Sequence, residues 1–265
     1  MPRLDCLEEP EWLARRRPGF EPGLRKAVHA LLHGEHYTGV PEYDSFADDY
    51  DAWSADMTED VAWYVELARA AGEPIVELAV GSGRVAIPIA RETGKRVIGV
   101  DRSPAMLAVA RERAAGLPVE LREGDMRDLA LDEPVDLVIC PFRSLLHLPT
   151  WADKRRVFER VAASLRPGGQ FAWNSFAFSP MIAAQLHEQR IEHESGLWEI
   201  NRYIPADNRI ELTRGRGDKT LGVLHAWWVA KSEWDGLVDV AGLGVEALDG
   251  GFNREQFDDD SRELV

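Results

Sequence analysis

Two glycines and an acid, each at the end of an apolar run, are the residues of this chain best placed to do chemistry. A short apolar run that ends in Glu77 is followed by Gly81 and Gly83, which open a helical pattern. Glycines there let the backbone turn sharply from strand to helix and approach a ligand. The next apolar run delivers Asp101 to the carboxyl end of the neighbouring strand, where an acid can accept both hydroxyls of a ribose. The spacing therefore predicts a nucleoside-cofactor site.

Two classes of cofactor use this geometry. Residues 81–86 fit the pattern G-x-G-x-x-A, and Asp101 follows at close to the spacing of a dinucleotide-binding fingerprint. Glu77 favours the other class, because a carboxylate near this turn would repel a pyrophosphate and attract a sulfonium cofactor that carries an ammonium group. The local charge favours the cation, and a dinucleotide is the alternative.

The elements that must position these residues alternate between strand and helix. After the run at 97–103, helical patterns at 103–115 and 151–165 separate further strands at 118–126, 134–142 and 170–176. Such alternation predicts right-handed crossovers and a parallel sheet that binds its ligand at the carboxyl ends of the strands.

In this order the motifs resemble those of the class I S-adenosylmethionine (SAM)-dependent methyltransferases. ELAVGSGR is similar to their glycine-rich loop, GVDRSPAML to their ribose-binding acid and adenine-stacking helix, and GDM to their adenine-edge acid. DLVICPFRSLLHL resembles the strand that passes the reactive methyl group, and LRPGGQF the turn before strand five. The resemblance implies that SAM, and its product S-adenosylhomocysteine, are bound by Tyr43, Glu77, Ala79, Gly81, Gly83, Arg84, Asp101, Arg102, Met106, Gly124, Asp125, Met126 and Phe142.

Several of these assignments have a second interpretation. Ala79 stands in place of the first family glycine and should be tolerated if its φ is negative. Asp101 could instead be an acid at a helix N-terminus, and Asp125, expected to accept from the adenine amine, could be an ordinary polar strand end. Glu77 could bind backbone amides alone, and Met106 could pack in the core.

The catalytic candidates follow the fourth strand. Methyl transfer is an in-line displacement at an activated carbon, so alignment matters most and no metal is expected. His147 is the candidate base, with a structural histidine as the alternative. Arg143 could clamp an anionic group of the acceptor or pair with an acid. Tyr43 and Tyr50 belong to an aromatic stripe that indicates either core packing or, by the resemblance, a lid over SAM.

The chain is expected to fall into four parts around an α/β core. Residues 1–71 form a helical preface and lid, with a helix at 22–32; residues 72–176 form the SAM-binding Rossmann-like core. Alternating polar and apolar positions and turn residues in 177–232 predict an antiparallel β-rich cap. Its aromatic residues could pack in the core or face the acceptor, and of the adjacent Trp227 and Trp228 one should pack on the core and the other face the pocket or a partner chain. Residues 233–265 return to the core as a helix at 233–241 and strands at 244–250 and from 261. The fold class is thus three-layer α/β/α with a mostly parallel seven-stranded sheet.

Composition narrows the function. The 265 residues carry a net charge of −15 without a basic patch, which disfavours nucleic acid and anionic membranes as partners. Cys6 and Cys140 lie too far apart in sequence to suggest a disulfide framework or zinc spacing. Neither a signal core nor a membrane span is visible, so a reducing cytoplasm is expected.

These observations predict an enzyme that transfers a methyl group from SAM to nitrogen or oxygen of a small molecule. The FRSLLHL segment, the strand-rich insert and the C-terminal segment are similar to small-molecule N-methyltransferases, including aminosugar N,N-dimethyltransferases. The alternatives are a non-catalytic module that binds SAM or S-adenosylhomocysteine and an NAD-dependent oxidoreductase. A homodimer through the β-rich insert is a further expectation.

Overall fold

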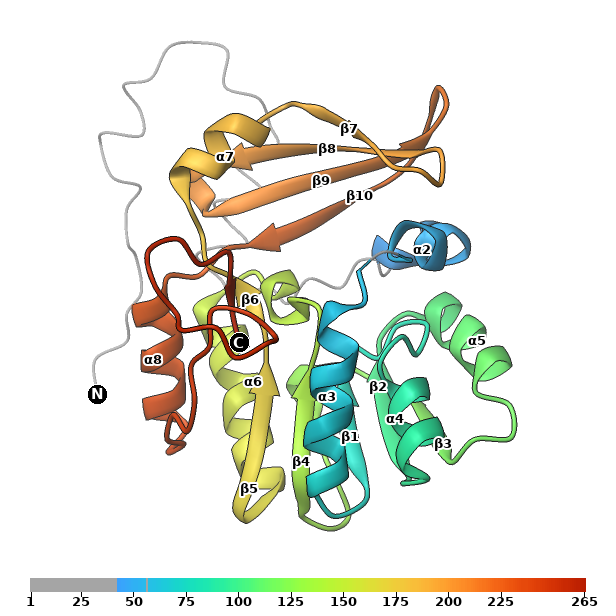
Figure 1. Ribbon diagram of the computed structural model, residues 1–265, viewed down its shortest axis with the longest axis vertical. Helices are drawn as coiled ribbons and strands as arrows, with labels where there is room; N and C mark the ends of the chain where they lie inside the picture. The colour runs from blue at the N-terminus through green and yellow to red at the C-terminus, as the bar shows by residue number, and fades with distance from the viewer. Residues whose placement is uncertain (1–41, 56) are drawn as a thin grey trace, which may run out of the picture. The chain divides into compact units, whose positions relative to one another are not determined.

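The computed structural model describes residues 42–55 and 57–265 (Figure 1). The helix expected at 22–32 and Cys6 lie outside the described residues. Within the described part, no helix has the length and apolar character needed to cross a membrane.

A five-stranded parallel sheet forms the centre of the core, as the alternating pattern predicts. The strands lie in the order β3-β2-β1-β4-β5, so β1 and β4 are neighbours although two helices and two strands separate them in sequence. Their carboxyl ends, where the glycine loop and the catalytic candidates begin, therefore meet at one edge. The bounds are β1 Ile75–Leu78, β2 Val97–Asp101, β3 Val119–Glu123, β4 Val135–Cys140 and β5 Leu165–Trp173.

Helices cover both faces of this sheet and complete three layers. In β1, Ile75 packs with α3 and α4, while the next residue, Val76, packs with α6 and α8, because successive side chains of a strand point to opposite faces. α5 begins at Pro104 after Ser103, whose hydroxyl accepts from the Met106 N–H. The helices are α3 Glu59–Ala70, α4 Ala86–Thr93, α5 Pro104–Arg113, α6 Trp151–Ser164 and α8 Lys231–Val240.

The expected seven-stranded sheet is corrected by the structure. β6 (Ser175–Phe176) and β11 (Glu263–Leu264) form a separate two-stranded antiparallel ladder, and the segment 244–250 contributes only an isolated bridge at Asp249. The alternation in 244–250 does not extend a sheet: Leu248 packs against the core, but Val245 is 61% exposed.

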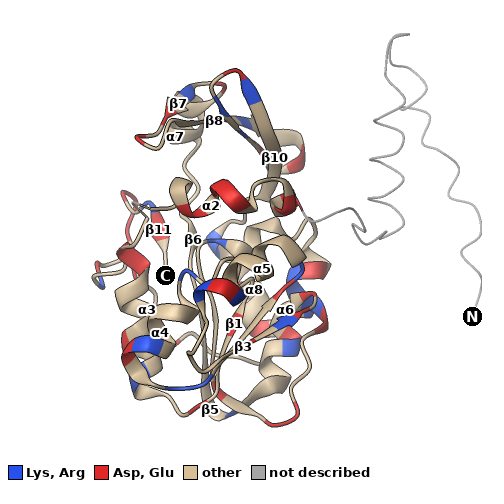
Figure 2. Cartoon of the chain, turned by 90° about the vertical axis from the view of Figure 1, so that its right-hand side faces the viewer, with Lys and Arg blue, Asp and Glu red and all other residues tan. Residues whose placement is uncertain are grey.

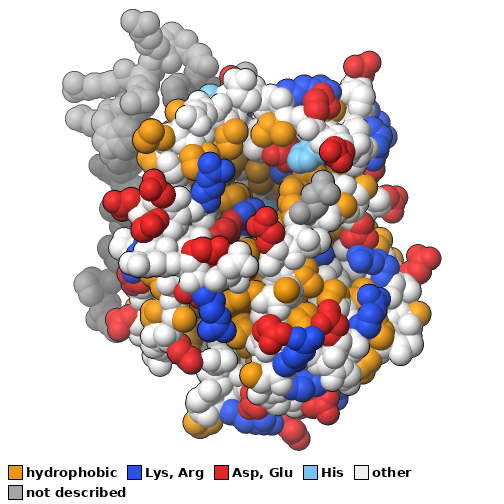
Figure 3. Space-filling model, in the orientation of Figure 1, with side chains coloured by type: hydrophobic (Ala, Val, Ile, Leu, Met, Phe, Trp, Pro, Cys, Tyr) orange, Lys and Arg blue, Asp and Glu red, His pale blue; other side chains and the backbone are white. Residues whose placement is uncertain are grey.

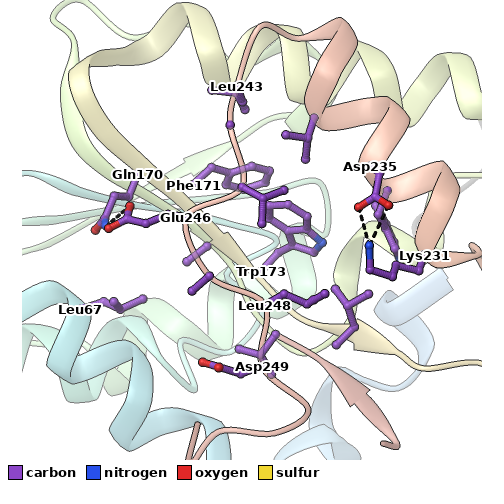
Figure 4. Close-up of a pocket in the computed structure, with 18 of the residues that line it drawn as sticks. Leu67, Gln170, Phe171, Trp173, Lys231, Asp235, Leu243, Glu246, Leu248 and Asp249 are labelled. Atoms are coloured by element: carbon purple, nitrogen blue, oxygen red, sulfur yellow. Dashed lines mark hydrogen bonds and ion pairs between the residues drawn. The ribbon is translucent and has the colours of Figure 1, made fainter. Parts of the chain in front are cut away.

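A cavity of about 480 Å³ lies between β5, α8 and the segment 243–249 (Figure 4). Gln170 on β5 reaches Glu246 through a side-chain hydrogen bond of 2.7 Å, and not through a strand ladder. The lining of this cavity includes none of the residues predicted to bind SAM or to act in catalysis.

The β-rich insert forms an antiparallel cap above the carboxyl ends of the core strands (Figure 1). The order is β10-β9-β8-β7, and the turns fall where the sequence predicts them, at Asn208 and Gly217, both with positive φ. The short edge strand β7 was not expected from the sequence. The bounds are α7 Pro180–Leu186, β7 Arg190–Glu192, β8 Leu197–Ile204, β9 Arg209–Arg216 and β10 Lys219–Trp227.

Candidate active site

The glycine loop after β1 adopts the left-handed backbone conformation three times. Gly81 and Gly83 have φ of 55° and 81°, and a Cβ on Gly83 would lie 2.8 Å from Ile87 Cδ1. Ala79 has φ of 53°, so the condition under which an alanine should be tolerated there, a negative φ, is not met. The loop requires a left-handed residue at 79 whichever side chain stands there, and an alanine costs about 1–2 kcal/mol in that region.

Asp101 connects this loop to α5. Its two carboxylate oxygens accept hydrogen bonds from the backbone N–H groups of Gly81 and Ser103, each at 2.8 Å. Burial raises the pKa of Asp101, and the two N–H donors oppose that rise. Each oxygen has a further lone pair, which could accept a ribose hydroxyl. The loop and the expected ribose acceptor are therefore one unit.

Glu77 is a buried acid with an unpaired oxygen. The residue is 2% exposed, and its Oε2 has no hydrogen-bond partner among the described residues. Burial raises the pKa of this carboxyl well above its usual value. Nearby Arg84 does not neutralise it by direct pairing, because its guanidinium binds both oxygens of Asp60. A buried, unpaired carboxylate oxygen suits the ammonium group of a cationic cofactor.

Asp125 lies at the end of β3 as predicted, but a residue that the sequence did not single out engages it. Arg127 donates to Asp125 from its backbone N–H and from Nε, both at 2.9 Å. These bonds outweigh burial and lower the pKa of Asp125. Arg102 Nε lies 3.8 Å from Asp125 Oδ2. The preceding residue, Gly124, donates its backbone N–H to the Asp101 carbonyl at 2.8 Å. Arg127 also pairs with Asp153, so Asp125 is part of a larger ion-pair network.

The predicted lid lies against the cofactor-binding candidates. It comprises a 3₁₀ turn, η1 (Glu42–Ser45), and α2 (Ala47–Trp53), which is rich in acidic residues (Figure 2). Phe46, Tyr50 and Trp53 are buried in one cluster with Met106 and with Leu197 of the cap. The aromatic stripe is therefore packed in a core cluster beside α5 and the cap, and a lid over SAM stays a prediction. Burial raises the pKa of Tyr50 to about 12, so its hydroxyl stays protonated.

Two consecutive residues after β4 have a strained backbone. Phe142 and Arg143 have φ of 58° and 63°, a conformation that is uncommon for non-glycine residues. The turn places the Phe142 ring under the Arg84 guanidinium, with 4.4 Å between the Arg84 Cζ atom and the ring centroid. It also turns Arg143 to Glu263 on β11, with which it forms an ion pair. Of the two roles considered for Arg143, pairing with an acid is the one the structure contains.

His147 is hydrogen-bonded at both ring nitrogens. Its Nδ1 lies 2.6 Å from the carbonyl oxygen of His225, and its Nε2 lies 2.9 Å from the hydroxyl of Tyr43. A carbonyl only accepts, so Nδ1 carries the proton and Nε2 accepts from Tyr43. Burial lowers the pKa of His147 and raises that of Tyr43, so both are neutral near pH 7. The structure thus brings a predicted lid tyrosine and the predicted base into one pair.

This pair faces a cavity of about 320 Å³ between core and cap. The lining comes from the lid, from the turn after β4 and from the inner face of the cap, including Tyr203 and Arg214. Figure 3 shows a hollow between the cap and the core, with hydrophobic side chains inside it. Of the adjacent Trp227 and Trp228, neither lines this cavity, and Trp228 stacks on Phe178 with ring centroids 4.3 Å apart. Neither is Tyr50 among the lining residues.

Other residues of this site gave no signal in the sequence. Arg214 is 4% exposed, pairs with Glu199 at 3.1 Å and lies over the Trp53 ring. Glu42 binds His225, which lies 183 residues away in sequence. Only the position of Glu42 next to Tyr43 could have suggested that it matters.

Comparisons with known proteins agree with this arrangement. Residues 75–169 match the family model described as a methyltransferase domain. The dTDP-4-amino-2,3,4,6-tetradeoxy-D-glucose N,N-dimethyltransferase of Saccharopolyspora spinosa is 37% identical over 67 residues, which span 25% of this chain and 26% of that protein.

Solved structures match over more of the chain. The CcbJ methyltransferase from Streptomyces caelestis has a TM-score of 0.67 and 26% identity over 78% of this chain and 92% of its own. DesVI from Streptomyces venezuelae has a TM-score of 0.61 and 23% identity over 83% and 96% of the two chains. SAM-bound CalS10, an amino pentose methyltransferase from Micromonospora echinaspora, has a TM-score of 0.56 and 20% identity over 94% and 98%. The family model identifies residues 75–169 as a methyltransferase domain, and the motif order and the fold are similar to those of class I SAM-dependent methyltransferases.

Proposed function

We propose that this chain transfers the methyl group of SAM to an amine nitrogen of a small, sugar-like acceptor held between the core and the cap. The observation that carries the proposal is the Tyr43–His147 pair, which joins the lid to the turn after β4 and lines the cavity of about 320 Å³. A volume of this order suits one small molecule.

SAM supplies a methyl group already activated by a sulfonium, so the residues of the chain must mainly align the acceptor with it. The glycine loop and Asp101 would hold the ribose side, and the unpaired Glu77 oxygen would accept the ammonium group. The lid aromatics, buried between α5 and the cap, would exclude water from the reacting groups.

The electrostatics favour nitrogen over oxygen as the acceptor atom. An alcohol must lose its proton to become a good nucleophile, whereas a neutral amine already has a free lone pair. The lowered pKa makes His147 a weak base. An acceptor N–H could donate to the Tyr43 hydroxyl oxygen while Tyr43 donates to His147, which would orient the nitrogen lone pair.

The named relatives support this substrate class. Besides the N,N-dimethyltransferase and CalS10, the sugar N-methyltransferase KedS8 from Streptoalloteichus has a TM-score of 0.58 and 20% identity over 86% of this chain and 93% of its own. A small aminosugar is therefore the first acceptor to test.

The test is a mass-shift assay with SAM and a panel of aminosugars matched to the corresponding hydroxyl sugars. The proposal expects transfer to the amines alone, and Tyr203→Ala should raise the acceptor KM, because Tyr203 lines the cavity. Transfer to the hydroxyl sugars alone would assign O-methylation instead. A homodimer through the cap stays a proposal, which sedimentation analysis would test.

A further inference from the structure

The edge of the cap sheet lies against the candidate base. β10 is the last strand of the cap sheet, so its outer edge presents N–H and C=O groups that need partners other than a strand. At His225 both the N–H and the C=O group have such a partner. The N–H donates to Glu42 Oε2 at 2.8 Å, and the carbonyl accepts from His147 Nδ1 at 2.6 Å.

Glu42 holds this residue at two points. Besides the backbone N–H, the His225 ring nitrogen Nδ1 lies 2.6 Å from Glu42 Oε1. The bonds from His225 outweigh burial and lower the pKa of Glu42, so the carboxylate is charged near pH 7. A charged acceptor with two donors on one residue is a strong and directional clamp.

Tyr43, the residue after Glu42, contacts the other nitrogen of the His147 ring. Tyr43 donates to His147 Nε2, while Glu42 holds the strand whose carbonyl accepts from His147 Nδ1. Two adjacent lid residues thus control both nitrogens of one imidazole, one directly and one through β10. If the carbonyl moved away, Nδ1 would lose the partner that keeps the proton there, and Nε2 could carry the proton instead.

We propose that Glu42 is a positioning residue that clamps His225 at the edge of β10 and so holds His147 in the tautomer whose Nε2 accepts from Tyr43. Its effect on turnover rests on the proposed function. Its effect on the tautomer does not, because the tautomer is set before an acceptor binds.

Three variants separate this role from general attachment of the lid. Glu42→Ala removes both contacts to His225. His225→Ala keeps the backbone N–H and carbonyl and loses only the ring. Asp49→Asn is the matched control, because it removes the charge from another contact between lid and cap, the Asp49–Arg216 ion pair at 2.7 Å, without touching His147.

The experiment reads the ring nitrogen shifts of His147 by ¹⁵N NMR with S-adenosylhomocysteine bound, and kcat with an amine acceptor. We expect the Nδ1–H tautomer in the wild type, in His225→Ala and in Asp49→Asn, and a mixture in Glu42→Ala. In Glu42→Ala, kcat should fall by up to about tenfold, no more than the loss expected when His147 itself is replaced, with S-adenosylhomocysteine affinity and acceptor KM unchanged. Glu42→Gln, which keeps one acceptor oxygen, should restore part of that loss.

A pure Nδ1–H tautomer in Glu42→Ala would overturn the proposal. So would the same mixture in Asp49→Asn, because lid attachment in general would then explain it. If the wild type methylates no amine, the proposed function fails, and the NMR comparison still decides whether Glu42 sets the tautomer.

Discussion

Replacing Asp101 by asparagine should weaken the cofactor site and the fold at once, by separable amounts. In the native protein the two carboxylate oxygens accept from Gly81 and Ser103 at 2.8 Å each. Asparagine has one acceptor oxygen, so its NH₂ group would face one of these donors and leave it unpaired. A buried unpaired donor costs about 1–3 kcal/mol, and the removal of a buried charge offsets part of that.

The loss in affinity comes from a different interaction. A ribose hydroxyl bonded to a carboxylate contributes about 1.5–3 kcal/mol, and each 1.4 kcal/mol corresponds to roughly tenfold in the dissociation constant. S-adenosylhomocysteine should therefore bind roughly ten- to hundredfold more weakly to Asp101→Asn. Urea unfolding of the unliganded protein measures the loss of fold stability. Titration calorimetry well below the melting temperature measures the loss of S-adenosylhomocysteine affinity.

Glu123→Gln is the matched control. Glu123 is the exposed acid opposite Asp101 in the β2–β3 register, so the change removes a charge nearby without touching the loop. Its affinity and stability should equal those of the wild type. A folded Asp101→Asn protein that binds S-adenosylhomocysteine as tightly as the wild type would refute the assignment of Asp101 to the ribose.

The remaining predictions concern the loop, the buried acid and the base. Gly94→Ala, at φ +68° with open space around it, should destabilise the fold by about 1 kcal/mol through backbone strain alone. Gly81→Ala adds a Cβ 3.1 Å from Met106 Cε. Of the two variants, only Gly81→Ala should weaken S-adenosylhomocysteine binding, and equal binding losses in both would contradict the role of the loop. Because burial raises the pKa of Glu77 in the folded state, this carboxyl binds more protons in the native protein than in the unfolded chain, and its contribution to stability should fall as pH rises above about 4.3. Glu77→Gln should flatten this slope in urea titrations across pH, and an unchanged slope would place the titration elsewhere. His147→Asn should lower kcat roughly tenfold with SAM affinity unchanged; a loss in the 10²–10⁴ range of a general base would show that proton removal matters more than alignment.

The elements of the core could be predicted because they depend on local patterns. Apolar runs, helical periodicity and turn residues are properties of short windows, and the five parallel strands and the antiparallel cap follow from them. The places of Gly81, Asp101 and Asp125 at the ends of successive strands follow as well, because parallel strands bring their carboxyl ends to one edge.

The failures have a common cause in packing between distant segments. The run 244–250 has strand-like residues, yet Glu246 meets β5 only through its side chain and Val245 faces solvent. The φ of Ala79 is set by the turn that the whole loop must make, which its own side chain disfavours.

The amino-acid sequence by itself predicted a nucleoside-cofactor site and the residues that begin it, since these depend on the types and spacing of neighbouring residues, and its motif order carried the resemblance to SAM-dependent methyltransferases. The tertiary structure alone decided how the candidate catalytic groups are held. Tyr43 meets His147 across 104 residues and Glu42 meets His225 across 183. No local pattern encodes such contacts, because they exist only once the lid, the turn after β4 and the edge of the cap sheet have packed together.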